Sequence, residues 1–114
     1  MLQSKIPVIL DTDIGGDPDD VFALNLLLNS QEVAIKLIVT ADEHEDHRAR
    51  FARQFVLAAG HDIPVVSGAS LGRSKYCHVC RAAAGYDGCE IRSDVAQAVV
   101  EVLSEFPDAR YLCI

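Results

Sequence analysis

The feature that most constrains the fold is the alternation of short apolar runs with longer amphipathic segments. The apolar runs have strand length, whereas the segments between them repeat apolar residues at helical spacing. The expected strands occupy residues 5–10, 33–40, 63–66 and 109–114, and the expected helices occupy residues 19–28, 44–59 and 93–106. Strands that alternate with helices of this length pair in parallel through right-handed crossovers. The sequence therefore predicts an α/β fold of the Rossmann-like type, with an open parallel sheet and flanking helices.

Two of the expected helices carry signals at their ends and along their faces. Gly60 is the stop signal of the second helix, and the arginines and His47 are expected to cover its solvent face. Ser93 is the expected N-cap of the last helix. The apolar face of the second helix is expected to contain Phe51, Phe55 and Ala58, flanked by Ala52, Val56 and Ala59. Residues 67–92 are polar, small and aperiodic, which predicts a long loop that carries function.

A run of acidic residues and glycines follows the first expected strand directly. Of residues 11–20, five are aspartates and two are glycines. Such strand-to-helix turns line the binding crevice of open α/β sheets. Carboxylates gathered there repel one another, so we expect a cation to bind between them. Gly15 and Gly16 allow close backbone approach, and Asp17 or Asp19 can cap the following helix. Oxygen-only ligands suit Ca²⁺ or Mg²⁺, and a flexible cluster with several oxygens favours Ca²⁺.

The acidic run also permits helix capping or an EF-hand loop. Aspartates gather at helix starts simply as N-caps, which accounts for one or two of these residues but not all five. An EF-hand loop is the second alternative, because Asp11, Asp13 and Gly16 fit its first, third and sixth positions. Its twelfth position requires a bidentate glutamate, and Phe22 stands there. The run therefore fits a strand-to-helix metal loop better than an EF-hand.

Length and charge limit the classes of function. Residues 1–114 are expected to form a single α/β domain, and because the chain stops inside its last strand we expect it to be the amino-terminal portion of a longer one. The net charge of −7 argues against a nucleic-acid partner. No apolar stretch has the length of a membrane span or of a signal peptide, so no membrane partner and a cytoplasmic location are expected.

The cysteines invite a second metal hypothesis. Cys77 and Cys80 have the spacing of zinc ligands, and Cys89 follows nearby, but no second ligand pair is present in the sequence. A structural zinc site is therefore an alternative, and reduced thiols are the preferred expectation for all the cysteines, Cys113 included.

The acidic run and its flanks resemble a known family. Residues 8–24, Val-Ile-Leu-Asp-Thr-Asp-Ile-Gly-Gly-Asp-Pro-Asp-Asp-Val-Phe-Ala-Leu, are similar to the amino-terminal signature of the nucleoside hydrolases of the inosine-uridine preferring type. The resemblance extends over nearly all of the chain, through residues 37–40, 50–60, 62–65, 68–69 and 85–88. It implies a nucleoside hydrolase-like sheet and Ca²⁺-dependent hydrolysis of the N-glycosidic bond of ribonucleosides, giving a free base and ribose in purine and pyrimidine salvage.

The resemblance also implies roles for individual residues. Asp13, Asp19 and Asp20 would ligate calcium, and Asp19 would also be the general base. Because this chain inserts Asp17 and Pro18 into the family's loop, Asp17 could replace Asp19 or Asp20 in either role. The loop would be oriented by Asp11, Gly15 and Gly16. Asp42 stands where the family commonly presents an asparagine to ribose, and is the candidate substrate contact.

Several questions stay open at this point. The substrate is a small nucleoside of unassigned base, since Ala84 stands where many family members carry a histidine, and homo-oligomerisation is undecided. We expect little activity from this chain alone, because the family's later half supplies further calcium ligands. The alternatives are a truncated, non-catalytic cation-binding α/β module and a Mg²⁺-dependent phosphohydrolase of the haloacid dehalogenase type. The latter would use Asp11 and Asp13 but requires a hydroxyl residue where Gly15 stands.

Overall fold

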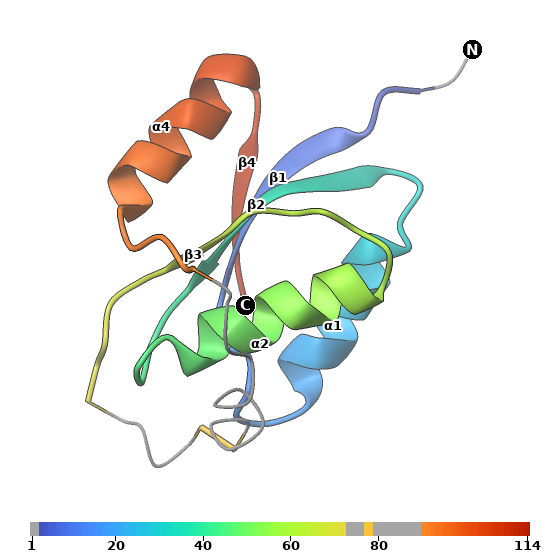
Figure 1. Cartoon of the computed structure of the whole chain (residues 1–114). Helices are drawn as coiled ribbons and strands as arrows, with labels where there is room; N and C mark the ends of the chain where they lie inside the picture. The colour runs from blue at the N-terminus through green and yellow to red at the C-terminus, as the bar shows by residue number, and fades with distance from the viewer. Residues whose placement is uncertain (1–2, 73–76, 79–89) are drawn as a thin grey trace.

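Four strands form one all-parallel sheet in the computed structural model, which describes residues 3–72, 77–78 and 90–114 (Figure 1). The strands are β1 (Ile6–Thr12), β2 (Val33–Thr40), β3 (Val65–Ser67) and β4 (Arg110–Cys113), in the spatial order β3-β2-β1-β4. The helices of the described residues are α1 (Asp19–Leu28), α2 (His47–Ala58) and α4 (Val95–Glu105). The predicted α/β fold with an open parallel sheet is confirmed.

The helices cover both faces of the sheet, which creates two apolar cores (Figure 1). On one face α1 and α2 pack through Leu24 and Val56 against sheet residues such as Leu10 and Ile38. On the other face, Ala98 of α4 is buried with a second set of sheet residues, namely Ile9, Leu37, Val39 and Val66. Because neighbouring residues of β1 and β2 alternate between the two cores, these strands read as continuous apolar runs in the sequence.

The direction of the chain reverses next to β1, and this reversal places the acidic turn. From β1 the connections through α1 and α2 lead outward to β2 and β3, whereas α4 crosses the opposite face and returns the chain to β4 beside β1. In open α/β sheets a crevice opens beyond the carboxyl ends of the strands at such a switch point. The turn between β1 and α1 contains Asp13 and Asp17, and Asp19 and Asp20 begin α1, so these aspartates lie at the position where this fold class binds ligands.

Two elements have the predicted bounds, two strands are displaced from the predicted bounds, and β4 is one residue shorter than expected at each end. Helix α1 and strand β2 begin and end as expected. Strand β1 continues to Thr12, so that Asp11 belongs to the sheet and not to the turn. The third strand was expected at residues 63–66 but spans Val65–Ser67. Pro64 lacks an N–H group and contributes only its carbonyl, which accepts a hydrogen bond from the Ile38 N–H at 3.0 Å.

Helix α2 differs from its prediction in its start and in its buried face. It begins at His47 and not at residue 44, because Glu45 and Asp46 have left-handed backbone conformations, with φ of 50° and 60°. Its buried residues are Arg48, Ala49, Ala52 and Val56. Phe51 and Phe55 are partly buried, whereas Ala58 and Ala59 are exposed. The expectation that arginines cover the solvent face is therefore wrong for Arg48.

The end of α2 is as predicted, whereas the predicted N-caps are wrong. Gly60 has a φ of 85°, and the N–H groups of Gly60 and His61 bind the carbonyls of Leu57 and Val56, which is a Schellman motif. The N-caps of α1 and α4 are Pro18 and Asp94, neither with a side-chain cap hydrogen bond, in place of Asp17 or Asp19 and of Ser93. The carboxylate of Asp94 is bound instead by the guanidinium of Arg92, at 2.8 and 2.9 Å. None of the helices in the described ranges is long and apolar enough to span a membrane.

Candidate functional site

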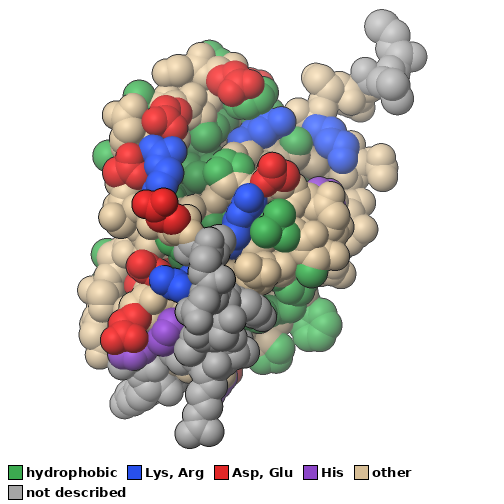
Figure 2. Space-filling model, viewed as in Figure 1, with side chains coloured by type: hydrophobic (Ala, Val, Ile, Leu, Met, Phe, Trp, Pro, Cys, Tyr) green, Lys and Arg blue, Asp and Glu red, His purple; other side chains and the backbone are tan. Residues whose placement is uncertain are grey.

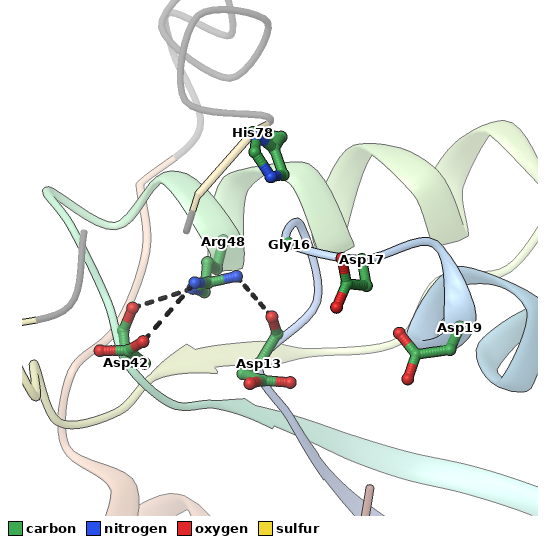
Figure 3. Close-up of a pocket in the computed structure, with 7 residues that line it drawn as sticks. All are labelled: Asp13, Gly16, Asp17, Asp19, Asp42, Arg48 and His78. Atoms are coloured by element: carbon green, nitrogen blue, oxygen red, sulfur yellow. Dashed lines mark hydrogen bonds and ion pairs between the residues drawn. The ribbon is translucent and has the colours of Figure 1, made fainter. Parts of the chain in front are cut away.

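An acidic cavity of about 240 Å³ opens at the carboxyl ends of β1 and β2 (Figure 3). Its residues come from the turn after β1, from the turn after β2, from the buried start of α2 and from the segment near residue 78. The lining residues are Asp13, Gly16, Asp17, Asp19, Asp42, Arg48 and His78. The structure thus brings together Asp13, Asp17, Asp19 and Asp42, which were separate candidates in the sequence.

The turn after β1 is shaped by buried contacts of its own residues. Thr12, which is 1% exposed, accepts a hydrogen bond from the Ile14 N–H at 3.1 Å and donates one to Asp20 Oδ2 at 2.6 Å. Gly15 has a φ of 111°, a conformation that L-residues with side chains rarely adopt. Together with the fully buried Ile14 side chain, these contacts direct the carboxylates of Asp13 and Asp17 toward the cavity (Figure 3).

Asp20 lies behind the cavity, and its carboxyl group is close enough to Asp13 and Asp19 for their charges to affect its pKa. It is 7% exposed and does not line the cavity itself. Burial raises the pKa of Asp20, the hydrogen bond from Thr12 lowers it, and the neighbouring carboxylates of Asp13 and Asp19 raise it further. The net shift is upward, with burial as its largest cause, and the carboxylates of Asp13 and Asp19 add to it because like charges disfavour ionisation.

Arg48 joins the turns that follow β1 and β2. Its side chain is 1% exposed, and its Nε donates to the Asp42 carbonyl at 2.8 Å. Its Nη1 donates to the carbonyls of Asp13 and of Ile14, the latter at 3.1 Å, and its Nη2 lies 3.7 Å from Asp42 Oδ2. Figure 3 shows the guanidinium between Asp42 and Asp13. The only buried cation among the described arginines and lysines therefore fixes the two turns that carry the candidate site residues.

The turn after β2 is held by a second buried network around Glu43. The Glu43 side chain is 4% exposed and accepts hydrogen bonds from the backbone N–H groups of Arg48 at 3.2 Å and Ala49 at 2.9 Å. It also accepts one from the hydroxyl group of Thr40. These bonds satisfy N–H groups of the first turn of α2, where a negative charge is favourable. Glu43 is therefore the acidic residue that caps α2, although it lies outside the helix.

The neighbouring backbone approaches this turn so closely that a glycine is required. A Cβ atom added to Gly68 would lie 2.0 Å from the Thr40 carbonyl oxygen. The next residue, Ala69, accepts a hydrogen bond from the Glu43 N–H at 3.2 Å. Gly68 thus lets the chain leaving β3 pack against the end of β2, and Asp42, which is 7% exposed with a φ of 55°, is held in the wall of the cavity.

Asp11 and the two glycines of the turn lie in different surroundings from one another. Asp11 does not line the cavity, because its Oδ2 accepts a hydrogen bond from the Tyr111 hydroxyl at 2.7 Å across to β4. Burial and this hydrogen bond raise the pKa of Tyr111. Gly16 lines the cavity, and the carbonyl of Gly15 accepts a hydrogen bond from the His78 N–H at 2.7 Å. His78 is thereby attached to the acidic turn.

The cysteine-containing loop is described only in part. Cys77 is buried and forms a disulfide bond, so the expectation of reduced thiols is wrong for this residue, and a zinc site that uses its thiolate is not formed. Cys113 is a free and exposed cysteine, as expected. Cys80, Cys89, Ala84 and residues 85–88 lie outside the described residues.

Sequence reasoning missed Arg48, Glu43, Thr12 and His78. A signal for Arg48 was present, because positions 48, 52 and 56 share one helical face and the last two carry small apolar residues that pack against the sheet. Glu43 directly precedes a helix that has no acidic residue in its own first turn, which is a weaker signal. Nothing in the local pattern around Thr12 or His78 indicates their contacts, since both bind residues of a separate element or turn.

Comparisons of the chain with protein-family models, with curated proteins and with solved structures found no match. The resemblance to the nucleoside hydrolases is therefore carried by the quoted motifs alone, and the function it implies stays a prediction.

Proposed function

We propose that this chain carries the calcium-binding half-site of a nucleoside hydrolase-like enzyme that cleaves the N-glycosidic bond of ribonucleosides to base and ribose. The observation that carries the proposal is the convergence of Asp13, Asp17 and Asp19 on one cavity at the switch point of the sheet. Their side chains extend into the same space from the turn after β1 and from the first residue of α1 (Figure 3). A nucleoside is a small molecule with vicinal hydroxyl groups, which hard cations and carboxylates both bind through oxygen.

The donor set of the cavity fits a hard dication. The carboxylates of Asp13, Asp17 and Asp19 supply oxygen ligands, and Asp20 adjoins them closely enough for its pKa to be raised by the charges of Asp13 and Asp19. No thiolate is found among the described residues that line the cavity. Carboxylates that repel one another in this way are stabilised when a dication binds between them, and a calcium ion accepts six to eight oxygen ligands of flexible geometry. When bound, calcium would supply a coordinated water of lowered pKa and a ligand for sugar hydroxyls.

The residues that line the cavity would have different roles in the proposed reaction. Asp19 lines the cavity and begins α1, and it is the proposed general base that accepts a proton from the attacking water, with Asp17 as the other candidate. Negative charge on these carboxylates would also stabilise an oxocarbenium-like transition state. Asp42, whose carboxylate lies 3.7 Å from the Arg48 guanidinium, is the proposed contact for a sugar hydroxyl. Arg48 would position these carboxylates, because it is hydrogen-bonded to both turns that carry them.

One structural detail disfavours the phosphohydrolase alternative. In that mechanism the first aspartate of Asp11-Thr-Asp13 would attack the phosphoryl group, but Asp11 is hydrogen-bonded to Tyr111 and does not line the cavity. The remaining carboxylates would also repel a phosphate. A non-catalytic cation-binding module uses the same residues as the proposed enzyme, so experiment must separate the two.

Calcium binding is the first test. Thermal unfolding of the full chain should shift to higher temperature with added CaCl₂, because ligand at a hundred times its Kd stabilises the folded state by about 2.7 kcal/mol. Asp13→Asn and Asp17→Asn should each reduce the shift, whereas Asp108→Asn, an exposed aspartate far from the cavity in sequence, should leave it unchanged. No calcium-dependent shift in the wild-type chain would overturn the proposed function.

Ribose release is the second test. Inosine and uridine are incubated with the chain in calcium or EDTA, and free ribose is measured as reducing sugar. Calcium-dependent release that Asp19→Asn abolishes supports the enzyme, whereas calcium binding without release by any longer form of the chain supports the non-catalytic module. Release of phosphate from p-nitrophenyl phosphate with Mg²⁺, abolished by Asp11→Asn, would favour the phosphohydrolase.

The proposal includes a cellular setting. Hydrolysis of free nucleosides belongs to purine and pyrimidine salvage, which places the proposed enzyme in the cytoplasm with a small-molecule substrate and without a nucleic-acid partner. The disulfide bond of Cys77 is less usual in that compartment, where thiols are kept reduced. Fractionation of cells that express the chain would test the location directly.

A further inference from the structure

A cluster of two histidines and a glutamate lies in the turn between β2 and α2, outside the acidic cavity. His44, Glu45 and His47 each offer one ligand atom, and these three atoms lie within 4.8 Å of one another. In Figure 2 histidine and acidic side chains lie next to each other at the lower left of the molecule, where Figure 1 places this turn. None of the three residues lines the acidic cavity. We propose that His44, Glu45 and His47 form a site for zinc or a similar divalent transition-metal ion.

The backbone of the turn brings the two imidazoles together. The His47 N–H donates to the His44 carbonyl at 3.0 Å, which closes a turn with the two histidines at its ends. Their rings meet edge to face, with centroids 5.4 Å apart. Glu45 and Asp46, between them, both have positive φ, at 50° and 60°. The local conformation therefore places three ligand-bearing side chains of a four-residue segment on one side of the turn.

The imidazole of His47 has ring nitrogens that the described residues leave without a hydrogen bond. Its Nδ1 atom is buried and has no hydrogen-bond partner among the described residues. Its Nε2 atom lies 3.9 Å from Glu45 Oε2, too far for a hydrogen bond. A metal ion bound at Nε2 would therefore displace no hydrogen bond to a described residue, and it would fix the orientation of a side chain that is 14% exposed.

The other acidic residues of the same turn already have partners, which singles out Glu45. Glu43 binds the first turn of α2. Asp46 Oδ1 accepts a hydrogen bond from the Ser67 hydroxyl at 2.6 Å, and Asp42 pairs with Arg48. The Glu45 side chain is 77% exposed, and its contact is with His47. Glu45 is thus able to rotate onto an ion held by the two histidines.

The donor set decides the class of metal. Two imidazoles and one carboxylate suit zinc, nickel or copper, whereas calcium prefers oxygen ligands alone. Zinc holds such ligands at about 2.0–2.2 Å and takes a fourth, so three protein ligands leave one position for water. Ligand atoms within 4.8 Å of one another reach these distances by small rotations of the exposed His44 and Glu45 side chains. This site is therefore chemically distinct from the proposed calcium site.

Cobalt and zinc titrations test the proposal. The full chain, freed of metal with EDTA, is titrated with Co²⁺ at a pH above the ordinary imidazole pKa of about 6.5. We expect visible d–d absorption without a near-ultraviolet thiolate charge-transfer band, and loss of this absorption when Zn²⁺ is added. His44→Ala, His44→Gln and Glu45→Gln should weaken binding at least tenfold, since loss of a mere supporting partner of a ligand costs about 10–100-fold.

Controls distinguish this site from the others. His61→Ala removes a histidine at a different position, and Asp13→Asn alters the acidic cavity, so both should keep the cobalt spectrum. Far-ultraviolet circular dichroism checks that each variant is folded. Absence of a cobalt spectrum in the wild type, a thiolate band, a spectrum that survives both His44 variants, or one that Asp13→Asn abolishes would each overturn the proposal. Because its ligands differ from those of the acidic cavity, failure here leaves the calcium proposal untouched.

Discussion

Replacement of Arg48 by methionine is the most informative perturbation of this structure. The side chain is 1% exposed and donates to the backbone carbonyls of Asp42, Asp13 and Ile14. Methionine fills a similar volume without any donor. Arg48→Met therefore removes three hydrogen bonds and a positive charge that lies 3.7 Å from Asp42 Oδ2, and it leaves polar oxygens in a partly buried environment.

The expected loss can be bounded from these contacts. A hydrogen bond from a charged group contributes about 1.5–3 kcal/mol, and three of them would exceed the usual effect of one mutation. Asp13 and Asp42 line the cavity, where water can replace part of the lost bonding. Removing one member of a buried charged pair costs about 3–5 kcal/mol in measured cases. We expect Arg48→Met to lower the free energy of unfolding by this amount.

Urea unfolding measures the effect, with Arg53→Met as the matched control on the same helix. Arg53 is also an α2 arginine and lies 2.7 Å from Asp62, whose side chain is 85% exposed, and an ion pair with an exposed partner contributes about 0–1 kcal/mol. Arg53 donates one hydrogen bond to a carbonyl, that of Ile63 at 2.8 Å, where Arg48 donates three. The midpoint should fall much further for Arg48→Met at an unchanged m-value. Equal losses in the two variants would refute the conclusion that Arg48 is the buried link between the two turns.

Individual contacts lead to three more expected outcomes. In α1, Leu24→Ala should lower the free energy of unfolding by about 2–5 kcal/mol because Leu24 is fully buried, whereas Leu26→Ala at a 72% exposed position should change it by less than about 0.5 kcal/mol. Equal effects of the two variants on urea unfolding would contradict the burial of α1. Thr12→Val should cost about 1–3 kcal/mol, measured in the same way, because the Asp20 carboxylate loses its buried donor; no loss would mean that this bond is not formed. Because the pKa of Tyr111 is raised, the folded state keeps a phenolic proton that the unfolded chain releases above about pH 10. The free energy of unfolding therefore falls as the pH rises through that value. Tyr111→Phe should remove this part of the fall in thermal unfolding at alkaline pH, and an identical pH dependence in both proteins would contradict the assignment.

The strands and α1 could be predicted from the sequence because their signals are local. Residues 33–40 form an apolar run that is buried on both faces of the sheet, and the bounds of β2 and α1 agree with the pattern. Gly60 ended α2 as expected, since glycine has no Cβ atom and adopts positive φ without strain. Local propensity also predicted Ser93 as a cap, but α4 begins only at Val95 with Asp94 as its N-cap, and the Asp94 side chain is bound by Arg92.

The acidic run was visible in the sequence, whereas the different contacts of its aspartates were not. The sequence suggested that Asp11 orients the loop and that the other four aspartates bind the metal, yet Asp11 binds Tyr111 on β4, a hundred residues away in the chain. Asp20 is bound by Thr12 behind the cavity, and Asp42 joins the cavity from a different turn. Asp11 lies inside β1, where it is paired with β4 and bound by Tyr111, whereas Asp13 and Asp17 lie beyond the end of the strand at Thr12.

The sequence by itself determined the class of fold and the presence of an acidic turn at the end of the first strand, because apolar periodicity and carboxylate spacing are written in consecutive residues. Only the tertiary structure decided that a buried arginine and a buried glutamate hold this turn against the next one. Burial depends on what packs around a residue, and for Arg48 and Glu43 the surrounding groups come from separate elements of the chain. The chemistry of the turn is therefore local, while its geometry is a property of the whole sheet.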